Sequence, residues 1–246
     1  MNYLVKISCW CSVALLVLYR AHAVAADSTS EEYNTIPKWV TRRNNSTMFW
    51  REYSRNVEAV RKINQSGKRA DVLLFGDSIT AWNKPMNLSK LAGSRNVWEK
   101  NFGDLVAEPL GIPGDRIDDV VWRLALGDEM PVLDPKVIIF FVGINDVVHK
   151  TPNIAERMDY LLGWISRHSP KSKLIVQLLL PSLSPAVAVN LDYTLLAFKY
   201  NATASFCMLD MKKNDRKYMV DILHPNERGQ DRLQKCLRRR FVDRYV

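Results

Sequence analysis

Three residues of this sequence have the types that nucleophilic attack on an ester requires. Ser78 follows an apolar run in the segment Gly76-Asp77-Ser78-Ile79-Thr80, and Asp221 and His224 stand close together near the end of the chain. A serine hydroxyl attacks a carbonyl once a base takes its proton, and an imidazole held by a carboxylate is such a base. We therefore expect Ser78 as nucleophile, His224 as base and Asp221 as the group that orients the imidazole.

The same chemistry needs donors for the tetrahedral oxyanion. The backbone N–H groups of Ser78 and Gly114 and the side-chain amide of Asn145 can supply three, each worth roughly 2.7–4 kcal/mol of barrier. Four of these residues also have a simpler interpretation. A Gly-Asp-Ser turn such as the one at Ser78 is often only a turn, Asn145 could cap the following helix, Asp221 could cap the last helix, and His224 could pack beneath it. Their joint order along the chain favours the catalytic interpretation.

The elements that must position these residues alternate between apolar runs and helical patterns. The run over residues 137–142 is apolar on both faces, which is typical of a parallel sheet covered on both sides. Alternation of this kind predicts one α/β layered domain, with ligands bound at the carboxyl ends of the strands, where the candidate residues lie. The expected strands are 72–75, 137–142, 174–180 and 205–209, and the expected helices are 48–63, 115–126, 154–165 and 225–241.

The N-terminus has the layout of a secretory signal peptide. Lys6 precedes an apolar run over residues 7–19, and small residues follow up to Ala26. A membrane anchor is the alternative, but the run is shorter than the roughly 20 residues that a spanning helix needs. We expect a signal peptide over residues 1–26, an N-terminal arm over 27–47 and one domain over 48–246. The predicted location is extracellular or in the endomembrane lumen.

Export changes how the cysteines and asparagines are interpreted. Cys9 and Cys11 would leave with the signal, and Cys207 and Cys236 would then either form a disulfide or remain two buried thiols. Asparagines in Asn-x-Ser/Thr become candidate glycosylation sites on an exported chain. These are Asn44, Asn45, Asn64, Asn87 and Asn201.

The formal net charge of +9 falls to +7 when Lys6 and Arg20 leave with the signal. The excess lies late in the chain, at Lys212, Lys213, Arg216, Lys217 and residues 238–240. It predicts a weak attraction to anionic lipid or acidic glycans, or only a solvated helix end that complements the helix dipole. No nucleic-acid partner is expected of an exported protein.

Taken together, these motifs resemble those of the SGNH (GDSL-type) hydrolase family, named for the Ser, Gly, Asn and His of four sequence blocks. Those residues would be Ser78, Gly114, Asn145 and His224, with Asp221 as the acid. Segments 98–103 and 114–124 are similar to the branch around the catalytic subunits of platelet-activating-factor acetylhydrolase. The resemblance covers about residues 48–240. It implies a three-layer α/β/α flavodoxin-like fold with a central parallel sheet of about five strands, and ester hydrolysis without a metal or cofactor.

Two positions differ from known motifs, one from the second sequence block of the SGNH family and one from the nucleophile motif of α/β-hydrolases. Pro109 stands two residues before Gly111, where relatives usually have asparagine, and Thr80 stands where the Gly-x-Ser-x-Gly motif of α/β-hydrolases has its last glycine. The resemblance still implies a secreted serine esterase that hydrolyses acetyl or short acyl esters on a glycan or lipid through an acyl-enzyme at Ser78. A non-catalytic secreted glycan- or lipid-binding protein on the same fold is the alternative. Loops 82–90 and 182–190 are expected to set the acyl size, and the oligomeric state stays open.

Overall fold

The apolar run before Ser78 forms β1 (Val72–Gly76), a strand whose five residues are all buried in the computed structural model. The structure describes residues 35–41, 46–84, 95–181, 183–211 and 215–246. Ile36–Val246 make up one compact unit. In the described ranges, none of the helices has the combination of length and apolar character that crossing a membrane requires.

Five parallel strands form the central sheet, in the order β2-β1-β3-β4-β5. The connection from β1 leads to one side of the sheet and the later connections lead to the other, so the order reverses between β1 and β3. In open α/β sheets the ligand crevice lies at this point, outside the carboxyl ends of the strands. The remaining strands are β2 (Ala107–Gly111), β3 (Val137–Phe141), β4 (Lys173–Gln177) and β5 (Thr203–Ser205).

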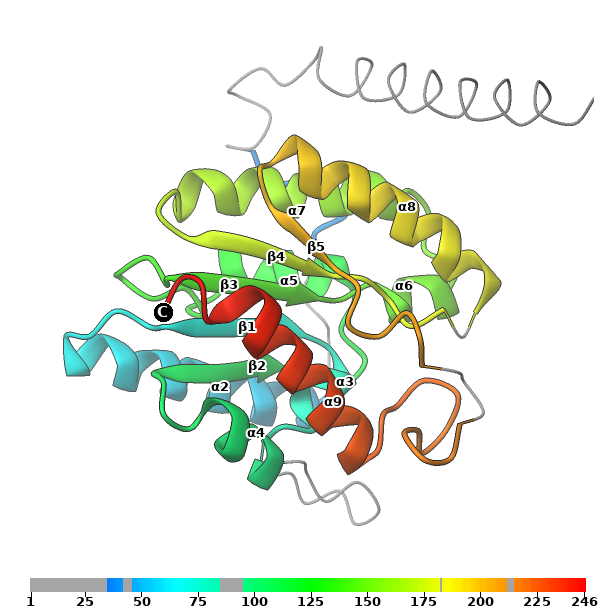
Figure 1. Cartoon of the computed structure of the whole chain (residues 1–246). Helices are drawn as coiled ribbons and strands as arrows, with labels where there is room; N and C mark the ends of the chain where they lie inside the picture. The colour runs from blue at the N-terminus through cyan, green and yellow to red at the C-terminus, as the bar shows by residue number, and fades with distance from the viewer. Residues whose placement is uncertain (1–34, 42–45, 85–94, 182, 212–214) are drawn as a thin grey trace, which may run out of the picture. The chain divides into compact units, whose positions relative to one another are not determined.

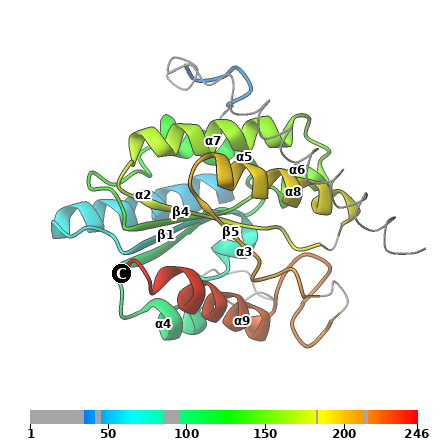
Figure 2. The same ribbon diagram turned by 45° about the horizontal axis from the view of Figure 1, so that its top comes forward.

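Helices cover both faces of this sheet (Figure 1; Figure 2). One face carries α5 (Ile117–Ala125), α7 (Ile154–His168) and α8 (Ser184–Lys199), and the other carries α4 (Arg95–Phe102) and α9 (Glu227–Leu237). The three-layer flavodoxin-like architecture expected from the sequence is therefore confirmed. Two short helices, α3 (Ser78–Ala81) and α6 (Ile144–Val148), follow β1 and β3 directly, and a π-helical turn, η2 (Arg238–Val242), continues α9.

The first described helix, α2 (Thr47–Ser66), has the boundaries that its capping residues dictate. The hydroxyl of Ser46 accepts the N–H of Phe49 at 3.3 Å, and Gly67 ends the helix with φ +65°, a left-handed conformation that glycine adopts without steric penalty. Along its length α2 packs aromatic rings against α5, with the ring centroids of Tyr53 and Trp122 5.4 Å apart.

Three sequence-based expectations about individual elements are wrong. The segment 205–209 was expected to be a strand, but β5 ends at Ser205 and a turn follows, in which the N–H of Leu209 donates to the carbonyl of Phe206. Residues 182–190 were expected to be a pocket-lining loop, but α8 begins at Ser184, with Pro185 in its first turn, where a missing N–H has no consequence. The expected strand 174–180 is shorter, ending at Gln177.

The strand β2 had no counterpart among the expected elements, because it contains Glu108 and Pro109 and its first two residues are only half-buried. It forms an edge of the sheet, where proline is tolerated because one side of the strand needs no hydrogen-bond partner. Pro109 pairs in register with Leu74, so the departure from the family pattern falls within a strand rather than a loop.

The structure joins Cys207, which follows β5, to Cys236 of α9 through a disulfide with a Cα–Cα distance of 5.7 Å. Among the candidate glycosylation sites, Asn64 lies on α2 and Asn201 in a turn after α8 with φ +49°, and both are exposed. The predicted signal peptide and most of the predicted arm lie outside the described residues, as do Asn44, Asn45, Asn87, Lys212 and Lys213.

Candidate active site

Ser78 stands at the start of α3, one residue beyond the turn that ends β1. The carboxylate of Asp77 caps this helix by accepting the N–H of Ile79 at 2.9 Å. The turn also requires glycine nearby: a Cβ on Gly76 would lie 2.4 Å from the carbonyl oxygen of Phe141, and one on Gly111 would lie 2.3 Å from the backbone nitrogen of Ala81. The close approach of β1, β2 and β3 therefore determines where Ser78 is held.

The three residues expected to act as nucleophile, base and acid form one hydrogen-bonded chain. The Oγ of Ser78 lies 2.9 Å from Nε2 of His224, and Nδ1 of His224 lies 2.7 Å from Oδ2 of Asp221. For Ser78 to donate to Nε2, His224 must carry its proton on Nδ1, where Asp221 accepts it. In that tautomer the hydrogen-bonded chain has the proton arrangement that activates a serine hydroxyl.

Asp221 is anchored by more than the imidazole. Its second oxygen accepts the backbone N–H groups of Leu223 and His224, each at 2.8 Å. Partial burial alone would raise the pKa of Asp221, but the hydrogen bonds from His224 and from these N–H groups outweigh it and lower the pKa. The side chain is 49% exposed, so its charge is partly screened by solvent.

Trp82 packs against one face of the imidazole ring of His224. Its ring stacks on the imidazole of His224, with centroids 4.3 Å apart and an angle of 22° between the planes. From the sequence, Trp82 is expected in a loop that lines the pocket. In the structure Trp82 follows α3 directly and is buried, with 4% of its surface exposed. No sequence signal connects it with His224, because the contact exists only where α3 meets the loop before α9.

The expected oxyanion donors come from the loops after β2 and β3. Gly114 has φ +81°, a left-handed conformation that favours glycine. Asn145 lies in the first turn of α6, and its side-chain Nδ2 donates to the carbonyl of Asp115 at 2.9 Å. This hydrogen bond brings the second and third sequence blocks together, with the amide of Asn145 beside the segment that contains Gly114.

A buried ion cluster that the sequence analysis did not identify supports this loop. The guanidinium of Arg123, on α5, is fully buried; its Nε lies 3.0 Å from Oδ2 of Asp115 and its Nη1 donates to the carbonyl of Leu110 at 2.9 Å. Arg123 also pairs with Glu129, which accepts Nδ2 of Asn56 at 3.0 Å. Breaking a buried pair of this kind typically costs about 3–5 kcal/mol, so Arg123 fixes the loop after β2 firmly.

Two buried carboxyls lie next to the candidate catalytic residues. Burial raises the pKa of Asp77 to about 7, with the nearby charge of Asp146 adding to the effect. Burial likewise raises the pKa of Asp146 to about 7, although its carboxylate accepts the N–H of Ile117 at 3.1 Å. The carboxyl of Asp77, directly before Ser78, is therefore largely protonated below neutral pH.

Across the described part of the chain, no group of three or more His, Cys, Asp or Glu side chains could hold a metal ion. The residues that the structure does bring together are the five expected from the sequence, in two sets. Ser78, His224 and Asp221 form the hydrogen-bonded chain, and Gly114 and Asn145 lie on the loops at the adjoining strand ends.

The chain is similar in sequence to known proteins over nearly half of its length. The chain is 33% identical to the platelet-activating factor acetylhydrolase IB subunit alpha2 of Homo sapiens over 114 residues. This aligned region is 46% of this chain and 45% of that protein. Over the same length it is 27% identical to the IB subunit alpha1 of Rattus norvegicus. The matched region thus spans about half the length of these curated relatives.

Solved structures share the fold at low sequence identity. A member of the lipolytic protein G-D-S-L family from Veillonella parvula superposes with a TM-score of 0.55 at 19% identity, covering 69% of this chain and 97% of that one. The psychrotrophic esterase EstA from Pseudoalteromonas gives 0.51 at 20% identity, covering 68% and 93%.

The family model described as the GDSL-like Lipase/Acylhydrolase family matches residues 74–232. This match covers nearly two thirds of the chain and contains all five candidate residues. The chain therefore belongs to the GDSL-like lipase/acylhydrolase (SGNH) family of carboxylic ester hydrolases.

Proposed function

We propose that this protein is a secreted serine esterase that hydrolyses acetyl or short acyl esters through an acyl-enzyme at Ser78. The observation that carries the proposal is the continuous chain of hydrogen bonds from the Oγ of Ser78 through His224 to Asp221. A protein that only binds an ester has no use for a base directed at a serine hydroxyl.

In the first step the Oγ of Ser78 attacks the ester carbonyl while its proton passes to Nε2 of His224. The imidazolium that forms is stabilised by Asp221, which already accepts the Nδ1 proton at 2.7 Å. The tetrahedral intermediate then collapses, the alkoxide leaves with the proton from Nε2, and an acyl-Ser78 ester remains. Trp82 keeps the imidazole plane in place during both transfers.

In the second step water takes the position of the alcohol. His224 accepts a proton from the attacking water, the second tetrahedral intermediate collapses, and the proton returns to the Oγ of Ser78 as the acid departs. The oxyanion of both intermediates is held by the N–H groups of Ser78 and Gly114 and by the amide of Asn145. The N–H of Ser78 is suited to this role because N–H groups in the first turn of a helix have no intrahelical acceptor.

Two observations support the finer parts of the proposal. The similarity to acetylhydrolase subunits favours a short acyl group as the part that is transferred to Ser78. The disulfide between Cys207 and Cys236 is the kind of bond that persists in an oxidising compartment, which favours export together with the N-terminal pattern of residues 1–26.

The test is hydrolysis of p-nitrophenyl esters from acetate to octanoate by the purified protein and by Ser78→Ala and His224→Ala. We expect turnover to be fastest with the short acyl groups and to fall by at least about 10⁴-fold in either variant. Ser54→Ala, on the exposed surface of α2, and His168→Ala, at the end of α7, are matched controls that should keep full activity.

A fluorophosphonate probe separates the esterase from a binding protein on the same fold. Covalent labelling of Ser78 in the folded protein, absent in His224→Ala, is the expected result, because only an activated serine attacks the phosphorus. Folded wild-type protein that is not labelled, or near-normal turnover in Ser78→Ala, would refute the esterase proposal in favour of a binding protein.

A further inference from the structure

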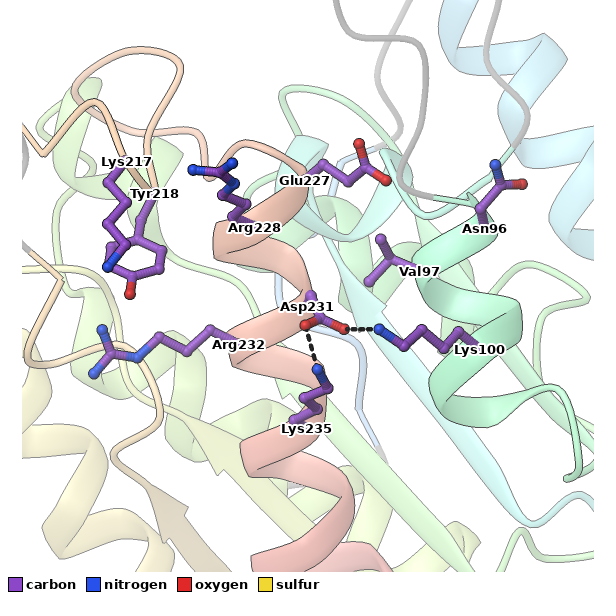
Figure 3. A pocket seen from close by; sticks show the side chains of 10 residues that line it. All are labelled: Asn96, Val97, Lys100, Lys217, Tyr218, Glu227, Arg228, Asp231, Arg232 and Lys235. Carbon is purple, nitrogen blue, oxygen red and sulfur yellow. Dashed lines mark hydrogen bonds and ion pairs between the residues drawn. The ribbon is translucent and has the colours of Figure 1, made fainter.

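A hollow of about 840 Å³ lies over α9, with α4 on one side and the loop that carries Lys217 on the other, and five of its ten lining residues are basic. Arg228, Arg232 and Lys235 project from α9, while Lys100 reaches in from α4 and Lys217 from the loop on the opposite side (Figure 3). We propose that this basic groove, defined by these five residues, binds an acidic polysaccharide. The inference does not depend on the esterase function, because neither Ser78 nor His224 lines the groove.

The five basic side chains outnumber the three carboxylates beside them: Glu227 and Asp231 line the groove, and Asp210 pairs with Arg232. Asp231 is shared by three donors: it lies 3.3 Å from Nζ of Lys100 and 2.5 Å from Nζ of Lys235, and it accepts Nδ2 of Asn101 at 3.2 Å. Within the described ranges, Arg228 and Lys217 form no ion pair with a carboxylate. The groove therefore presents positive charge that a bound anion can neutralise.

The helix dipole explains only part of this charge. Basic residues near the C-terminus of a helix are favourable, which accounts for Lys235 in the last turn of α9 and for residues 238–240 in η2 beyond it. Arg228, however, is the second residue of α9, where the positive end of the dipole opposes a cation. Because Arg228 is a cation at an unfavourable position of the helix and has no carboxylate partner in the described ranges, we infer that it binds an anion rather than stabilises the helix.

The basic residues form a continuous track rather than a single point. Arg228, Arg232 and Lys235 are spaced by four and three residues, so they share one face over about 10 Å of α9. Two adjoining hollows extend the positive surface. One of about 270 Å³ contains four cations and one carboxylate, Asp210, and the other of about 430 Å³ contains four cations and the carboxylates of Glu99, Asp104 and Asp243. The track thus suits an extended, repeating anion better than a single phosphate or sulfate.

The shape of the site favours a polysaccharide over the other common polyanions. A membrane surface is flat and is usually gripped by apolar side chains that insert between the lipids, but the one aliphatic side chain lining the basic groove, Val97, is buried. A nucleic-acid duplex is read by elements that protrude into its grooves, whereas these charges line a depression over α9. A thin chain that carries sulfate or carboxylate groups fits along α9, between α4 and the loop that carries Lys217, and the guanidinium groups can bind such oxyanions in bidentate fashion.

The experiment is titration calorimetry of a heparin octasaccharide into the full folded protein at about 0.15 M salt. The test variant is Lys217→Gln/Arg228→Gln, which removes two charges without leaving a carboxylate unpaired. The control variant is Lys68→Gln/Lys171→Gln, which lowers the net charge equally but lies at the amino ends of β1 and β4, at the opposite edge of the sheet from Ser78. Thermal unfolding of each variant verifies that it is folded.

We expect the wild type and the control variant to bind with the same affinity and the test variant to bind on the order of tenfold more weakly. Affinity should fall steeply as salt is raised, because charge neutralisation dominates. Equal losses in the two variants, or no binding by the wild type, would overturn the proposal. Tighter, groove-dependent binding of phosphatidylserine vesicles or a DNA duplex would overturn it in favour of that polyanion.

Discussion

The disulfide between Cys207 and Cys236 allows a quantitative prediction, because it closes a loop that contains two of the three candidate catalytic side chains. The two cysteines are 29 residues apart, and Asp221 and His224 lie between them. One end of the loop is attached to the sheet after β5 and the other to α9. Opening the bridge should therefore affect both the stability of the domain and the position of the base.

The stabilisation expected from the bridge can be calculated from the length of the closed loop. Cross-linking restricts the unfolded chain, and for a separation of 29 residues the loss of loop-closure entropy amounts to about 3.6 kcal/mol at 25 °C. For a unit of this size, a loss of that magnitude lowers the unfolding temperature by about 10 °C.

The assay is unfolding of Cys207→Ala/Cys236→Ala in urea, monitored by tryptophan fluorescence. The free energy of unfolding is extrapolated to zero urea. We expect the free energy of unfolding to fall by about 3–4 kcal/mol relative to the oxidised wild type. Wild type treated with a reductant is the control, because it loses the cross-link but keeps both sulfur atoms. Ester hydrolysis measured in parallel should be lost at lower urea in both samples.

An unchanged free energy of unfolding in the variant would refute the reasoning. The double variant has no disulfide that a reductant could break. If the reductant lowered the free energy of unfolding of the double variant as much as that of the wild type, the reasoning would also be refuted. Mass spectrometry that finds both cysteines as free thiols in protein purified without reductant would show that the bridge does not form.

Two further predictions concern the residues around Ser78. Asn145→Ala should lower kcat by about 10²–10³-fold with little change in KM, because the lost amide acts on the oxyanion of the transition state; steady-state kinetics that show an unchanged kcat would contradict this role. Asp77→Asn should make stability less dependent on pH. The folded pKa of Asp77 is about 7 against 3.8 for the free group, so its protonated form favours folding and that contribution is lost as pH rises from about 4 to about 7. Denaturant unfolding at pH 5 and pH 7 should show the wild type losing about 2–3 kcal/mol more than Asp77→Asn over this interval, and equal losses would rule out this titration.

Local patterns in the sequence were sufficient to predict an α/β layered domain and to select the residues that the structure brings together at the ends of its strands. Strands β1 and β3 are buried on both faces, so their apolar runs were visible without any knowledge of their neighbours. The residues that follow parallel strands meet at one edge of the sheet, so Ser78 and Asn145 could be placed near each other from their order alone.

Strand β2 and helix α8 could not be predicted in the same way, because their amino-acid patterns are explained only by their positions in the fold. Strand β2 is an edge strand with a proline and a glutamate, a composition that is acceptable only because one side of it has no neighbouring strand. Helix α8 is apolar on more than one face, with Phe198 82% exposed, so it lacks the one-sided periodicity by which a surface helix is recognised.

The sequence by itself determined which residues could carry out ester hydrolysis, because reactive side chains at strand ends are a local property of the chain. Only the tertiary structure decided how they are held. His224 lies 146 residues from Ser78, and its stacking on Trp82 follows from the packing of helices against the sheet. The same is true of the buried pairing of Arg123 with Asp115, next to Gly114. Such contacts between residues far apart in the chain form only on folding, and no periodicity or spacing records them in advance.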